Sequence, residues 1–260
     1  MKDYLPGLHF FAKHCSKMNI FTQSYPVRAA EIDRDFLMRR TAAAAYFQEC
    51  FAQYAASKTL AAYDVFKLGL TWLTSDMIVE FAPQMPFWRE KIDVSAWVRP
   101  ANSSIKIFVD FVGKCNGEKV FCGTSVQLIA DLAAHRPAKS DALVSRFERR
   151  EECAVESPVF EKIPDIDQPQ NSISKIVRSF DLDFNNHLNN VHYLPISFEA
   201  LPAEFRAKRK LKRYQIKFLR EVFLGDTVEA RAQIDGDTTL HSLSRSSDGG
   251  QMCKIIARWY

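Results

Sequence analysis

The fold of this chain is decided by one stretch, residues 34–57, which read RDFLMRRTAAAAYFQECFAQYAAS. Thr41 is followed by four alanines, which are strong helix formers, and four aromatic side chains then recur near helical spacing between Tyr46 and Tyr54. We predict one long helix here; a helix of ~22 residues would span ~33 Å and could cross a whole sheet. The small face of residues 42–45 would let a sheet pack closely, or would leave room for a ligand chain.

The sequence after this helix changes to the pattern of β-strands. Four segments rich in Ile, Val, Phe and Trp are predicted to be strands: 72–81, 91–98, 104–112 and 120–131. Asn116-Gly117, between the last two, strongly favours a hairpin turn. One long helix followed by four strands predicts an α+β domain in which an antiparallel sheet curls around the helix.

Residues 147–171 interrupt this pattern, because they are charged at first and then contain three prolines. We predict a linker there. The order then repeats, with a strand at 173–180, a helix at about 190–201 and strands at 214–219, 227–234, 238–244 and 252–260. The repeat predicts two tandem domains, 1–146 and 172–260, duplicated at an offset of about 150 residues, with sheets that join edge to edge.

The composition is that of an ordinary globular protein, with 47% hydrophobic and 25% charged residues. The 20 phenylalanines would suit an interior that holds a fatty or aromatic ligand, and they would equally suit a Phe-rich core. No apolar run approaches the ~20 residues of a membrane-spanning helix, and residues 1–20 resemble neither a signal peptide nor a transit peptide. We therefore expect a cytoplasmic protein.

Cysteine spacing and charge narrow the function classes. The 6 cysteines are scattered without Cys-x-x-Cys pairs, which argues against a zinc site and a disulfide framework, and no glycine-rich loop is present to cradle a phosphate. We therefore predict no metal and no nucleotide cofactor. The net charge of +4 is mild, and we expect no nucleic-acid partner.

The chemistry is predicted to lie in residues 180–193, FDLDFNNHLNNVHY. Asp183, Asn185 and His187 alternate, so an extended backbone would turn all three side chains to one side. An aspartate can activate water or attack a carbonyl, a histidine can move a proton at neutral pH, and an asparagine can hold the water or the carbonyl oxygen. The competing interpretation is a capped turn, since Asp and Asn are ordinary turn residues. The length of the motif favours the functional interpretation.

This motif, Asp-x-Asp-x-Asn-x-His-x-Asn-Asn-x-x-Tyr, resembles the signature of the acyl-acyl carrier protein thioesterases. The resemblance covers the chain from about Phe21 onward. It implies two fused hotdog domains, each a helix wrapped by an antiparallel sheet. It also implies a hydrolase of fatty acid biosynthesis that releases free fatty acid from acyl carrier protein, in a bacterial-type relative. By the same resemblance, Glu221 completes the site. Val222 stands where the family often has Cys, which favours carboxylate chemistry.

The hypothesised mechanism leaves one choice open, because either Asp183 or Glu221 could activate water or attack directly. Backbone N–H groups of residues 188–190 would stabilise the oxyanion. At the offset of about 150, Asn185 and His187 align with Asp35 and Leu37, so the second half is predicted to be catalytic and the first to bind substrate. Met38, Tyr46 and Trp72 are suggested as neighbours of the acyl chain.

Further expectations concern the residues after the motif and a basic run. Pro195 lies inside the second predicted helix, where the resembled family tends to have Gly. Tyr193 is expected to pack and His192 to lie on the surface. A basic run would dock the acidic carrier protein or form a solvated loop: Arg206, Lys208, Arg209, Lys210, Lys212 and Arg213. The alternatives are an acyl-coenzyme A thioesterase on the same fold and a non-catalytic acyl-binding protein, and a homodimer is left open.

Overall fold

The strands form one large sheet in a computed structural model that describes residues 20–101, 103–139 and 141–260. Within these residues the sheet has eleven strands in the order β1-β3-β4-β5-β2-β8-β11-β10-β9-β7, with β6 paired to β5, and every pairing is antiparallel. The strands are β1 (Phe21–Pro26), β2 (Leu70–Phe81), β3 (Lys91–Arg99), β4 (Ile107–Cys115), β5 (Glu118–Asp131), β6 (Arg136–Pro137), β7 (Asn171–Ile176), β8 (Leu211–Phe218), β9 (Thr227–Asp235), β10 (Thr238–Arg245) and β11 (Gln251–Trp259).

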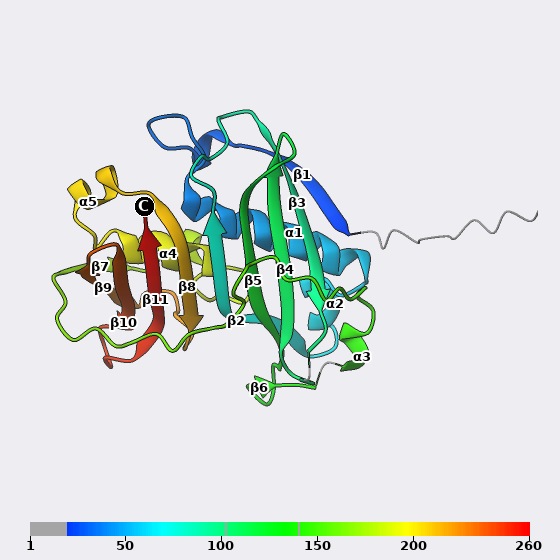
Figure 1. The fold of residues 1–260 in the computed structure, drawn as a ribbon. Coiled ribbons are helices and arrows are strands. Elements are labelled where there is room, and N and C mark those ends of the chain that lie inside the picture. Colours follow the sequence, from blue (N-terminus) through cyan, green and yellow to red (C-terminus); the bar gives the residue numbers. More distant parts are fainter. Residues whose placement is uncertain (1–19, 102, 140) are drawn as a thin grey trace, which may run out of the picture.

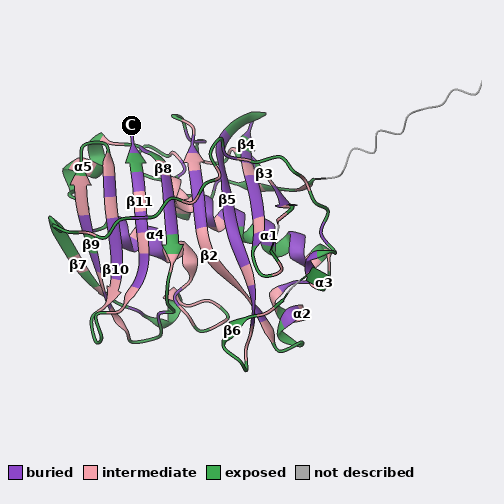
Figure 2. Ribbon diagram, turned by 60° about the horizontal axis from the view of Figure 1, so that its bottom comes forward, coloured by how far each residue is buried: buried purple, intermediate pink, exposed green. Residues whose placement is uncertain are grey.

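The two halves of the sheet meet at its centre, where β2 pairs with β8 (Figure 1). Val79 lies opposite Tyr214 and Met77 opposite Ile216, so the two strands that match in sequence are neighbours in space. The strand order is mirrored about this pair, which confirms the predicted edge-to-edge junction. Figure 2 shows buried residues along the central strands, whereas the outermost strand β7 is largely exposed.

Two central helices, α1 (Ala43–Ser57) and α4 (Asn190–Phe198), lie on the same face of the sheet (Figure 1). The predicted start of the first helix at residue 34 was wrong. A carboxylate oxygen of Asp33 accepts the backbone N–H groups of Asp35 (2.9 Å) and Leu37 (3.0 Å), and Phe36 takes a φ of 60°. This turn, followed by a 3₁₀ turn at Arg40–Ala42, delays the helix by nine residues. The short helices are α2 (Ala62–Phe66), α3 (Asp141–Val144) and α5 (Ala203–Lys208).

The predicted strands are confirmed with shifted ends. The hairpin at Asn116-Gly117 is present, with φ values of 51° and 85°, and joins β4 to β5. The first strand of the second half ends at Ile176 rather than at residue 180. The carboxylate of Asp181 binds Lys175 (2.7 Å) and the backbone N–H of Arg178 (2.9 Å), and this closes a 3₁₀ turn at Ser179–Asp181.

Much of the phenylalanine content serves the core under α1. Phe47 stacks on Phe111 with ring centroids 4.2 Å apart. Glycines in β4 and β5 make room for such rings: a Cβ at Gly123 would lie 2.3 Å from the Phe111 ring and 2.4 Å from a backbone oxygen of β2. The sheet can hold these rings only because glycine has no side chain at that point.

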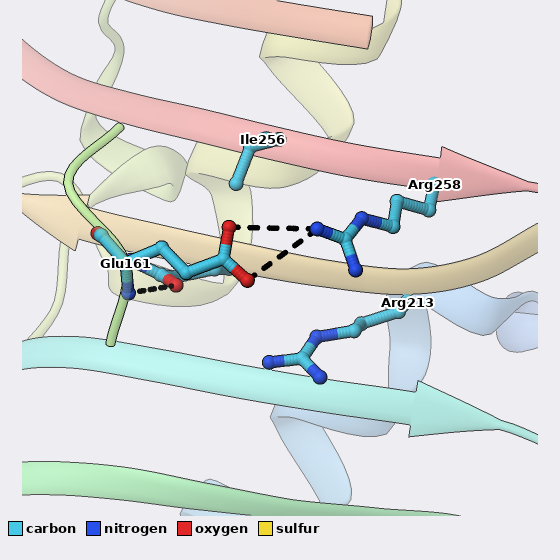
Figure 3. Close-up of a pocket in the computed structure, with 5 residues that line it drawn as sticks. Glu161, Arg213, Ile256 and Arg258 are labelled. Atoms are coloured by element: carbon cyan, nitrogen blue, oxygen red, sulfur yellow. Dashed lines mark hydrogen bonds and ion pairs between the residues drawn. The ribbon is translucent and has the colours of Figure 1, made fainter. Parts of the chain in front are cut away.

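The predicted linker crosses the outer face of the sheet, the face away from α1 and α4. Ala154 donates its N–H to the buried Asp110 (2.9 Å), and Val155 packs on Ile78. Further along, Glu161 and Gln215 exchange two hydrogen bonds, of 3.0 and 2.7 Å, and Arg258 lies 3.4 Å from the Glu161 carboxylate (Figure 3). These contacts fix the linker against strands of both halves.

Candidate active site

The motif residues lie in a tight turn, so the predicted extended backbone was wrong. The N–H of Asp183 donates to the His187 carbonyl (2.8 Å), the N–H of Asn186 donates to the Asp183 carbonyl (3.0 Å), and Asn186 has a φ of 61°. One carboxylate oxygen of Asp183 accepts the backbone N–H groups of Asn185 (2.8 Å) and His187 (3.4 Å). Asp183 therefore caps this turn, and the capped-turn interpretation describes its local geometry correctly.

The same turn occurs 150 residues earlier in the chain. Asp33 caps it as Asp183 does, and the bridge between Ile32 and Met38 repeats that between Leu182 and Leu188. This match confirms the predicted offset. The first half carries Asp35 and Leu37 where the second half carries Asn185 and His187, so only the second turn holds an amide and an imidazole.

His187 and Glu221 are in contact across two loops. Nδ1 of His187 lies 3.4 Å from Oε1 of Glu221, and the two side chains are 23% and 50% exposed. Glu221 lies three residues beyond the end of β8. The pair is held by backbone bonds, since the N–H of Leu188 donates to the carbonyl of Val222 (2.8 Å), and by the His187 ring packing edge-on against Phe223. The structure thus brings together the acid and the imidazole that the sequence predicted as neighbours.

A cavity of about 540 Å³ opens beside this turn, between the two central helices and the sheet. Its walls are alanines and aromatic residues of α1, side chains of α4, and inward-facing residues of β2, β5 and β8. Asp183 and Asn185 are among the lining residues, as is Asn190, whereas His187 and Glu221 are not. Of the two carboxylates, Asp183 is therefore the one that borders the cavity.

Of the three suggested neighbours of an acyl chain, Trp72 lines this cavity. Met38 and Tyr46 do not line it; both are 1% exposed and belong to the core, and the Tyr46 hydroxyl donates to the carbonyl of Pro26 (3.2 Å). Small side chains leave room for the cavity, since four alanines of α1 contribute to its wall: Ala44, Ala52, Ala55 and Ala56.

The predicted oxyanion donors need correction. The N–H of Leu188 is bonded to Val222, and the N–H of Asn189 donates to the carbonyl of Asp181 (2.9 Å). The side chain of Asn189 caps α4 by accepting the N–H of Val191 (3.3 Å). The N–H of Asn190, the first residue of α4, is the remaining donor of the three, since the first N–H groups of a helix have no acceptor within it.

Asn185 has a partner that sequence reasoning missed. Its Oδ1 accepts a hydrogen bond of 2.8 Å from the hydroxyl of Thr71, on β2 of the first half. No signal around Thr71 in the sequence pointed to this contact, which joins residues 114 positions apart.

Known proteins resemble this chain in sequence. Residues 166–260 match the family model described as the acyl-ACP thioesterase C-terminal domain. The chain is 25% identical over 259 residues to a chloroplastic palmitoyl-acyl carrier protein thioesterase of Cuphea hookeriana and 24% identical over 259 residues to a chloroplastic acyl-[acyl-carrier-protein] hydrolase of Cuphea viscosissima. Each alignment covers 92% of this chain and 62% of the relative.

This chain is similar to acyl-acyl carrier protein thioesterases. Its fold matches two solved structures: an acyl-ACP thioesterase from Bacteroides thetaiotaomicron (TM-score 0.81, 18% identity, 93% of this chain and 98% of that chain) and the 12:0-ACP thioesterase from Umbellularia californica (TM-score 0.82, 17% identity, 93% and 97%). The expected fold of two hotdog units, each a helix against an antiparallel sheet, is confirmed.

In this chain, which is similar to those thioesterases, the basic run is divided between two elements and is largely paired. α5 ends at Lys208 and β8 begins at Leu211, so the predicted loop shrinks to two residues. Acidic partners contact four of the six cations: Arg206 with Glu199, Lys208 with Glu204, Arg209 with Asp237 and Arg213 with Glu80. Lys212 lies over the Tyr260 ring, with its ammonium nitrogen 5.3 Å from the centroid.

The residues after the motif lie on α4 and differ in burial. Tyr193 is 3% exposed, packs edge-on against Phe218 with centroids 5.1 Å apart, and burial raises the pKa of its hydroxyl. Packing was expected for it. His192 was expected on the surface, but it is half-buried, and burial lowers its pKa. Pro195 lies inside α4, which continues past it to Phe198.

The described residues hold no cluster of three or more His, Cys, Asp or Glu side chains placed to bind a metal ion. In the same part of the chain, no helix combines the length and the apolar character that crossing a membrane requires. Of the cysteines described, Cys50, Cys115, Cys122 and Cys253 are buried and Cys153 is exposed. Cys15 lies outside the described residues.

Proposed function

We propose that this protein hydrolyses the thioester of fatty acyl-acyl carrier protein and releases free fatty acid. The observation that carries the proposal is the position of Asp183 and Asn185 on the wall of a largely apolar cavity, with His187 of the same turn in contact with Glu221. An apolar cavity with a few convergent polar groups is the usual form of a small-molecule site. The sequence relatives named as acyl carrier protein hydrolases support the same reaction.

In the proposed mechanism the acyl chain lies in the cavity and its carbonyl carbon reaches the turn of residues 183–187. The N–H of Asn190 donates to the carbonyl oxygen and stabilises the developing oxyanion. Asp183 removes a proton from water, a C–O bond forms and the C–S bond breaks. The His187–Glu221 pair passes the proton taken from water on to the leaving thiolate, so that Asp183 is again a carboxylate when the acid and the thiol are released. Direct attack by a carboxylate, with hydrolysis of the resulting anhydride, leads to the same products.

The test uses the duplicated turn as its own control. Asp33→Asn changes the same cap in the first half, and we expect it to leave hydrolysis close to wild type. Asp183→Asn should lower kcat by about 10²–10⁴-fold, the usual contribution of a positioned acid or base. His187→Ala and Glu221→Gln should also lower kcat. Equal effects of Asp183→Asn and Asp33→Asn would show that the carboxylate only shapes the turn.

The remaining predictions belong to the same proposal. The division into domains 1–146 and 172–260 is supported by the repeated order of elements, and the assignment of a substrate-binding and a catalytic half by where the amide and imidazole stand. Carrier protein docking rests on the exposed Lys208 and Lys210. Replacing both with Glu should impair hydrolysis of acyl-acyl carrier protein more than that of acyl-coenzyme A. A cytoplasmic location and a homodimer stay predictions from the sequence, and a protein that only binds acyl chains would release no thiol.

A further inference from the structure

The strand β2 runs on beyond the junction between the two halves. Only Asp76 to Glu80 of β2 pair with β8, whereas the strand begins at Leu70. Along the stretch that pairs with β5 but not with β8, the turn that carries Asn185 lies against Thr71, whose hydroxyl donates to Asn185 Oδ1 (2.8 Å). Trp72 packs edge-on against Phe51 of α1, and strand alternation turns Thr71 the other way. Thr71 is 6% exposed and is not among the residues that line the cavity.

This contact decides which end of the Asn185 amide faces the cavity. An asparagine side chain offers an oxygen that accepts and a nitrogen that donates two hydrogen bonds. Because Thr71 holds the oxygen, the nitrogen is the end left for a substrate. An N–H donor can bind the thioester carbonyl oxygen or the oxygen of the attacking water. In the reaction the carbonyl oxygen gains negative charge, and the water loses a proton.

We propose that Thr71 is a positioning residue, which holds the Asn185 amide so that Nδ2 donates to the reacting oxygen. The inference rests on the proposed function, because it needs Asn185 to act in hydrolysis. It makes the first half a part of the catalytic apparatus, and the second half alone lacks this contact. The two duplicated turns differ in this respect. Asp35, at the position equivalent to Asn185, is exposed, and its described hydrogen bond is to Asp33 of its own turn.

The test separates the hydroxyl group from the shape of the side chain. Thr71→Val keeps the branched shape and removes the hydroxyl, whereas Thr71→Ser keeps the hydroxyl. With an acyl-acyl carrier protein of one chain length, Thr71→Val should lower kcat roughly tenfold with little change in KM, because the loss of one hydrogen bond leaves the Asn185 amide less well held for its contact with the reacting oxygen. Thr71→Ser should restore kcat to within about twofold. Thr22→Val, which removes a hydroxyl bonded to Ser95 on β3, should leave kcat unchanged.

A double-mutant cycle tests the link to Asn185. Asn185→Ala should lower kcat, and adding Thr71→Val to it should cost nothing more, because the amide to be held is gone. Additive losses would overturn the inference, as would equal losses for the Val and Ser variants. If Asn185→Ala is impaired while Thr71→Val matches wild type, the inference fails and the proposed function stands. If Asn185→Ala itself matches wild type, the proposed role of Asn185 fails. Should Thr71→Val not fold, the comparison of Thr71→Ala with Thr71→Ser decides the same question.

Discussion

Stability below neutral pH should depend on one buried histidine, His241 on β10. It is 1% exposed, and its ring packs against Phe198 at 5.0 Å. Nδ1 lies 3.2 Å from the carbonyl oxygen of Ser197, which can only accept, so Nδ1 carries the proton. Nε2 then accepts from the Thr239 hydroxyl (2.8 Å), whose oxygen accepts from the indole N–H of Trp259 (2.9 Å). This network suits the neutral ring, and burial lowers the pKa of His241 from 6.5 to about 3.

The size of the effect follows from that pKa. Above pH 6.5 the ring is neutral in both the folded and the unfolded chain, so His241 adds no pH dependence. Below pH 6.5 the unfolded chain binds a proton and the folded chain does not until about pH 3, so the free energy of unfolding falls as the pH falls. The slope is ~1.4 kcal/mol per pH unit, which gives ~2 kcal/mol between pH 6.5 and pH 5.

The measurement is urea unfolding of the wild type and of His241→Asn at pH 7 and pH 5. Asn at this position retains a donor for the Ser197 carbonyl. The readout is the loss between the two pH values, so any fixed cost of the substitution cancels. We expect the wild type to lose ~2 kcal/mol more than His241→Asn over this range. The exposed His135, replaced by Asn, is the control and should follow the wild type. An equal loss in His241→Asn and wild type would refute the reasoning.

Two further predictions concern the cavity and the core. Ala55→Leu would place about three more carbon atoms in the cavity wall; at ~0.8 kcal/mol for each displaced methylene, kcat/KM for the longest accepted acyl chain should fall ~50-fold, with little change for short chains. Measurement over a ladder of chain lengths checks this, and a uniform fall would contradict it. Gly123→Ala should lower the free energy of unfolding by ~1–3 kcal/mol, because its Cβ would meet the Phe111 ring and the carbonyl of Ile78. An unchanged urea midpoint would show that the core shifts to accommodate the added methyl group. Gly117→Ala is the control: its Cβ would meet open space, so its loss of stability reports only the cost of a φ of 85°.

Local sequence was enough to predict the elements and their repetition. Strand alternation, helix formers and the Asn116-Gly117 turn act over a few neighbouring residues, and the structure repeats them at the predicted offset. The start of α1 was missed because one side chain, that of Asp33, bonds two backbone N–H groups and holds residues 33–37 in a turn despite their helix-compatible pattern. The contact between His187 and Glu221 was predicted from the resemblance to a family, since nothing in the sequence of their separate loops indicates it.

What the sequence by itself determined was that the second turn holds an amide and an imidazole that the first turn lacks, because turn capping and residue type are local properties. Only the tertiary structure decided which backbone N–H groups and charged side chains already have partners. It bonded the N–H groups of Leu188 and Asn189 to other loops, and it paired most of the basic run with acids. It also placed Thr71 on Asn185. A donor or acceptor bonds whichever partner the fold brings within about 3 Å. When the two residues are far apart in the chain, no local sequence pattern indicates the pairing.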